Sequence, residues 1–198
     1  MFLRAFFAVN AIECKRLSRI PGHGRLLPRR RDGSVLREFV LRCATLEVST
    51  MPTPSTYDDA NLILRLYELR REERMRSARK WYMEHFGPDT LAEFREMCPA
   101  GSDSNASFRQ VSSYYEMVAS FITGGVLNEE LYFQSGGELF LVFIRLEPFL
   151  GELREAFKNP GAYKSLEAVA ERYAAYINRN DPNAAGAFRS RMRAILGK

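Results

Sequence analysis

Four charged side chains, Glu116, Glu138, Arg145 and Glu147, lie in predicted helices that are otherwise apolar. An unpartnered charge inside a protein is strongly destabilising, so we expect any of these side chains that are buried to be paired. Glu138 and Arg145 are seven residues apart, which places them on the same face of a helix. The simpler interpretation is a structural ion pair. The alternative is a buried polar site that binds a ligand or supports catalysis.

A group of basic side chains, Arg70, Arg71, Arg74 and Arg79, is a candidate surface for an anion or an acidic partner. These arginines belong to a charged run over residues 68–80, in which glutamates are interleaved with them. A mixed run of this kind is typical of the solvated face of a long helix. Nucleic-acid binding through this helix is therefore the less favoured hypothesis.

Metal binding and nucleophilic catalysis have little support in the sequence. Residues 51–198 contain one histidine, His85, and one cysteine, Cys98. A structural zinc site takes about four ligands, and a catalytic serine or cysteine needs a base within hydrogen-bonding reach. Neither Gly124-Gly125 nor Gly136-Gly137 precedes the Lys-Ser/Thr pair of a phosphate-binding loop. We therefore predict no cofactor, no metal site and no enzymatic activity.

The formal net charge of +5 is unevenly distributed along the chain. Residues 1–50 contain ten Lys and Arg against four Asp and Glu, whereas residues 51–198 contain 19 basic and 20 acidic residues. Three interpretations of this basic arm are open: a region upstream of a true start at Met51, an organellar targeting segment, or a disordered basic arm. The abrupt change in composition favours a start at Met51. We expect residues 51–198 to form a single helical domain.

Cysteine usage and hydropathy indicate a cytoplasmic protein without a membrane span. Cys14 and Cys43 belong to the basic arm, so the remaining 148 residues have one thiol and cannot form an internal disulfide. The most apolar run, residues 139–150, is 12 residues long and contains Arg145 and Glu147. A bilayer requires about 20 apolar residues, so this run is predicted to be a core helix.

The element that must position the candidate residues is a central helical hairpin over residues 107–157. Its first helix begins at an N-cap, Asn105 or Ser107, and ends at Gly124. Pro148 removes a backbone hydrogen bond, so we expect a kink or break near residues 145–147. The side chains predicted to face the core are Phe108, Val111, Tyr115, Val118 and Ile122 in the first helix, and a wide apolar face from Leu139 to Phe157 in the second.

Helix start signals divide the rest of residues 51–198. A helix capped by Asp58 or Asp59 is expected to run unbroken to about Phe86, and a short helix follows over residues 89–97. Asn159-Pro160 and Asp181-Pro182 each begin a further helix. No segment shows the alternation of a strand. The sequence therefore predicts an all-α fold, a compact bundle of five or six helices around the central hairpin, with an irregular N-terminal arm.

Residues 129–135, Glu-Glu-Leu-Tyr-Phe-Gln-Ser, resemble the recognition sequence of the potyviral protease that is used to remove tags. Glu130 stands where that sequence usually has Asn. The stretch fits the local helical pattern, so we interpret the match as a coincidence and expect the folded protein to resist this protease.

Several stretches resemble a group of uncharacterised bacterial proteins. They are LILRLYELRR at residues 62–71, YYEMVA at 114–119, ELF at 138–140 and LEPFL at 146–150. The resemblance covers about residues 57–178 and implies a small helical domain. It implies no activity, cofactor or ligand.

The function inferred from the sequence is that of a non-catalytic, interaction or regulatory domain, which binds another protein or itself through an apolar or aromatic helix face. The alternative is a nucleic-acid-associated protein that uses the basic arm and the arginine-rich helix.

Overall fold

The computed structural model describes residues 54–195, and every regular element within them is a helix. The predicted all-α class is confirmed. The basic arm over residues 1–50 and the predicted start at Met51 lie outside the described residues. The elements are α3 (Tyr57–Arg71), α4 (Glu73–His85), α5 (Leu91–Met97), α6 (Asp103–Thr123), α7 (Glu129–Ser135), α8 (Glu138–Leu146), the 3₁₀ turn η1 (Glu147–Phe149), α9 (Leu150–Ala156), α10 (Lys164–Ile177) and α11 (Ala184–Ala194).

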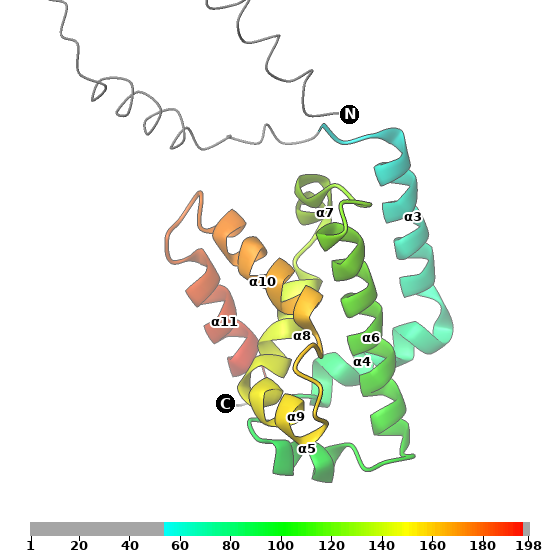
Figure 1. The fold of residues 1–198 in the computed structure, drawn as a ribbon, viewed down its shortest axis with the longest axis vertical. Coiled ribbons are helices and arrows are strands. Elements are labelled where there is room, and N and C mark those ends of the chain that lie inside the picture. Colours follow the sequence, from blue (N-terminus) through cyan, green and yellow to red (C-terminus); the bar gives the residue numbers. More distant parts are fainter. Residues whose placement is uncertain (1–53, 196–198) are drawn as a thin grey trace, which may run out of the picture. The chain divides into compact units, whose positions relative to one another are not determined.

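The helix that was predicted to run unbroken to Phe86 is divided at Glu72 into α3 and α4, which point in different directions (Figure 1). Leu66 of α3 and Met75 of α4 are both buried. They are nine residues apart, or about two and a half turns, so an unbroken helix would place them on opposite faces. The extended backbone of Glu72 resolves this conflict and allows both helices to bury an apolar side.

The long helix α6 runs through the middle of the bundle and packs against α4 on one side and α10 on the other (Figure 1). Its predicted apolar stripe is confirmed, since Phe108, Val111, Tyr115, Val118 and Ile122 are all buried. The helix begins earlier than predicted. Ser102 is the N-cap, and its hydroxyl accepts a hydrogen bond from the Asn105 backbone N–H at 3.1 Å.

The second half of the predicted hairpin is a succession of short helices. As predicted, the chain breaks next to Pro148: α8 ends at Leu146, η1 follows, and α9 begins at Leu150. One prediction for this segment is wrong, because Phe157 is 64% exposed instead of belonging to the buried face. It lies just after the end of α9, where the helical periodicity no longer determines which way a side chain points.

The last two helices begin later than their proline signals predict. Residues 159–163 form a turn, and α10 begins at Lys164 after Tyr163, whose backbone is left-handed (φ 55°). After Asp181-Pro182, the helix α11 begins at Ala184. The Asn178 side chain accepts a hydrogen bond from the Ala185 backbone N–H at 2.9 Å and so holds the start of α11 against the end of α10.

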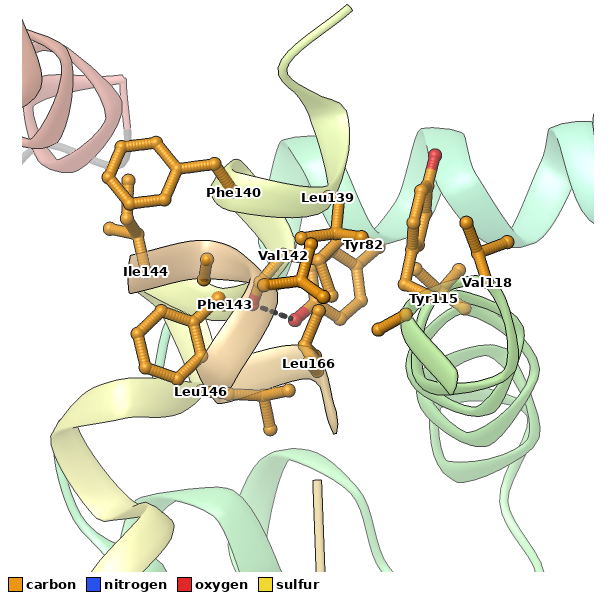
Figure 2. Close-up of a cluster of buried hydrophobic side chains, with 14 of the residues drawn as sticks. Tyr82, Tyr115, Val118, Leu139, Phe140, Val142, Phe143, Ile144, Leu146 and Leu166 are labelled. Carbon is orange, nitrogen blue, oxygen red and sulfur yellow. Dashed lines mark hydrogen bonds between the residues drawn. The ribbon is translucent and has the colours of Figure 1, made fainter. Parts of the chain in front are cut away.

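Tyr82 of α4 lies at the centre of the core, among apolar side chains of α8 and α10 (Figure 2). Its ring is fully buried, and its hydroxyl donates a hydrogen bond to the Val142 carbonyl oxygen at 3.1 Å. A buried hydroxyl without such a partner would be costly, so this bond both satisfies Tyr82 and fixes α8 against α4.

We expect the folded protein to resist the potyviral protease at the bond between Gln134 and Ser135. These residues belong to α7, and Phe133 beside them is buried at 4% exposure, so an extended substrate requires α7 to unfold. Incubation with the protease followed by intact-mass analysis tests this. Rapid cleavage under native conditions would contradict the helix; the urea-unfolded chain, diluted into protease, is the positive control for recognition despite Glu130.

Candidate functional site

Glu138, the first of the predicted polar residues along α8, is paired with two arginines. Its carboxylate accepts hydrogen bonds from Arg79 Nε at 2.5 Å and Arg79 Nη2 at 2.7 Å, and it lies 3.2 Å from Arg70 Nη1. Burial alone would lower the pKa of Arg79, but the hydrogen bonds and the charge of Glu138 outweigh it and raise that pKa above its usual value. Glu138 therefore ties α8 to both α3 and α4.

Arg145 is not paired with Glu138, so the predicted ion pair between these two residues is wrong, although Glu138 and Glu147 each form an ion pair with another arginine. The Arg145 side chain is buried and donates to three backbone carbonyl oxygens at the end of α4, those of Tyr82, Met83 (2.9 Å) and Phe86 (2.9 Å). The last turn of a helix leaves C=O groups without an intrahelical donor, and Arg145 supplies donors at this end of α4. The Tyr82 carbonyl oxygen also accepts the Phe86 backbone N–H at 3.2 Å. Burial lowers the pKa of Arg145, and the carbonyl groups supply the compensation that a carboxylate was predicted to give.

The other two predicted residues lie elsewhere and serve other helices. Glu147 in η1 forms an ion pair with Arg189 of α11. Glu116 of α6 accepts hydrogen bonds from the backbone N–H groups at the start of α10, those of Ser165 (3.2 Å) and Leu166 (2.8 Å). The structure therefore does not bring the four predicted residues together. Glu138 and Arg145 both link α8 to α4, at different places, whereas Glu147 links η1 to α11 and Glu116 links α6 to α10.

The predicted basic surface is also divided by the structure. Arg70 and Arg79 are part-buried against Glu138, whereas Arg71 and Arg74 are exposed. Two of the four guanidinium groups thus share one carboxylate partner within the fold. The nucleic-acid hypothesis stays a prediction, with two rather than four of its arginines in open solvent.

An apolar groove with a volume of about 760 Å³ lies between α6, α9 and the turn that follows α9. Its floor contains the buried side chains of Phe94, Phe108 and Leu153, and its walls carry Met117 and Phe157, which are 37% and 64% exposed. A cavity of this size with apolar lining and a few polar groups is typical of binding sites. Of the predicted residues, Glu116 is the one that lines it.

The turn at residues 158–163 forms one wall of the groove and contains both non-glycine residues with positive φ in the described part of the chain, Lys158 (φ 49°) and Tyr163 (φ 55°). Left-handed backbone is costly for such residues and persists where surrounding contacts impose it. The Tyr163 hydroxyl lies 3.0 Å from Ser112 Oγ, and its burial raises the pKa of Tyr163. Sequence reasoning missed this site, because no local signal shows that this turn folds back over α6.

Comparison with known protein families identifies the domain. A family model for a domain of unknown function, DUF4760, matches residues 55–173 of the 198-residue chain. The chain belongs to this family. No curated protein and no solved structure matches it. The DUF4760 match contains α3 to α9 and most of α10, so it includes the groove, whereas α11 follows it.

The histidine and the cysteine in the described part of this DUF4760 chain, His85 and Cys98, do not line the groove. His85 lines a second hollow with Glu84, Glu93 and Glu96, but within residues 54–195 no three His, Cys, Asp or Glu side chains are placed to hold a metal ion. Cys98 is buried, and burial raises the pKa of its thiol to about 11, which disfavours the reactive thiolate. No helix within the same residues is long and apolar enough to cross a membrane.

We expect the substitution Arg145→Met to lower the free energy of unfolding of this DUF4760 protein by about 3 kcal/mol. Methionine occupies similar space, but the carbonyl oxygens of Tyr82, Met83 and Phe86 then lose the N–H donors that Arg145 supplies. Urea denaturation followed by circular dichroism measures the change. The matched control, Arg95→Met on the exposed side of α5, is expected to change stability by less than about 0.5 kcal/mol. Equal stability of the two variants would contradict the role assigned to Arg145.

Proposed function

We propose that this domain is a non-catalytic protein-interaction module that holds its partner in the groove between α6 and α9. The observation that carries the proposal is the exposure of two large apolar side chains, Met117 and Phe157, that line the same apolar hollow. Exposed apolar patches that border a concave surface are typical of interaction sites, because covering them with a partner removes that area from water.

The turn at residues 158–163 supports the same proposal. It is fixed by the contact between Tyr163 and Ser112 of α6. It is also fixed by Glu116, which accepts hydrogen bonds from the backbone N–H groups of Ser165 and Leu166 in the first turn of α10. A wall fixed in this way needs little reordering when a partner binds, and this reduces the entropic cost of association.

Site-specific photo-crosslinking in the native host tests the proposal. We expect a photoreactive phenylalanine analogue at Met117 to form a defined protein adduct, and the same analogue at Leu64, which is 62% exposed on α3 outside the groove, to form none. The mass of the adduct then distinguishes a second copy of this chain from another protein.

A second variant makes the result specific to the groove. The substitution Phe157→Glu is expected to abolish the Met117 adduct and to leave the melting temperature nearly unchanged, because Phe157 packs little within the domain. The proposal is wrong if Met117 and Leu64 give the same adducts, or if no adduct forms at Met117.

A further inference from the structure

One charged side chain that lines the groove, Arg109, forms no ion pair within the described residues. Both carboxylate oxygens of Glu116 already accept backbone N–H groups of α10, whose N-terminal end is positive and balances this charge. Arg109 lies two turns earlier on α6, is exposed and lines the same groove. None of the ion pairs within residues 54–195 includes Arg109.

The wall formed by α6 is long. Asn105, Arg109, Ser113, Met117 and Ser120 line the groove from one end of the wall to the other. At about 1.5 Å per residue, this stretch measures roughly 22 Å, which matches a partner helix of about four turns. Apolar anchors at helical spacing, laid in a groove of this kind, are a recurrent mode of peptide recognition.

The origin of the exposed apolar area also favours a helix over a small amphiphile. Met117 belongs to α6 and Phe157 follows α9, so two separate elements contribute the exposed apolar side chains that line the groove. A helix with its side chains is about 10 Å across and presents apolar side chains on successive turns, which suits a surface built from two elements.

We infer that the groove binds an amphipathic helix of a partner protein, with apolar side chains against Met117 and Phe157 and an acidic side chain opposite Arg109. This inference rests on the proposed interaction function and specifies the chemistry of the partner. Charge complementarity at the rim contributes modestly to affinity and more to the choice and orientation of the partner.

The test uses two synthetic helical peptides of about 16 residues, each with leucines spaced by three and four residues. One peptide carries Glu at both ends of its apolar stripe, and the other carries Lys there, so the direction of docking does not matter. Fluorescence anisotropy with the full chain is expected to show the Glu peptide binding about two- to fivefold more tightly, the range of an exposed ion pair.

Two charge-reversal variants separate the effect of Arg109 from that of overall charge. Arg109→Glu is expected to reverse the ranking of the two peptides, whereas Arg76→Glu, at an exposed position of α4 outside the groove, is expected to preserve it. Phe157→Glu is expected to weaken both peptides at least tenfold.

Three outcomes would overturn the inference. One is equal binding of the two peptides that Arg109→Glu does not alter, and another is no measurable binding of either peptide. The third is displacement of the peptides by dodecanoate in a manner that depends on Arg109, which would make the ligand a small carboxylate. A Met117-specific protein adduct obtained together with the first or second outcome would retain the interaction function and remove only the acidic-helix partner.

Discussion

The bundle depends on the way in which α8 is held against α4 by polar side chains that are buried or partly buried. Glu138 at the start of α8 binds Arg79, the Val142 carbonyl in the middle accepts the Tyr82 hydroxyl, and Arg145 at the end binds the last carbonyls of α4. Each link pairs polar groups that would otherwise be costly to bury, and of the Arg145 nitrogens only Nε is left without a partner. Burial of the α8 side chains supplies the driving force, and these links determine the position in which α8 is held.

The groove is a consequence of the same packing. With α4 and α10 on its two sides, α6 keeps one further face, and this face is covered only in part by α9 and the turn after it. Glu116 connects the packing of the core with the groove, since it fixes the first turn of α10 and at the same time lines the groove. The contacts that complete the core therefore also position the elements that line the candidate binding site.

Helical periodicity correctly predicted which side chains of α6 are buried, but it did not predict the partners of the charged side chains. The seven-residue spacing of Glu138 and Arg145 correctly places them near one face of α8, yet each reaches a different part of α4. Local spacing gives the direction of a side chain and not the identity of its neighbours, and it did not indicate that backbone carbonyls would replace a carboxylate as the partner of Arg145. The break at Glu72 was missed for a related reason, because the run over residues 68–80 is so polar that its few apolar positions do not show a change of face.

By itself, the sequence determined the helical class, the apolar stripe of α6 and the break next to Pro148, because these follow from local propensity and from periodicity within one element. Only the tertiary structure decided the partners of the four charged residues, the exposure of Phe157 and the existence of the groove. These depend on contacts between residues about 40 or more positions apart, such as Glu147 with Arg189, Glu116 with Leu166 and Arg145 with Phe86. Chain topology creates such contacts, and no single stretch of sequence encodes them.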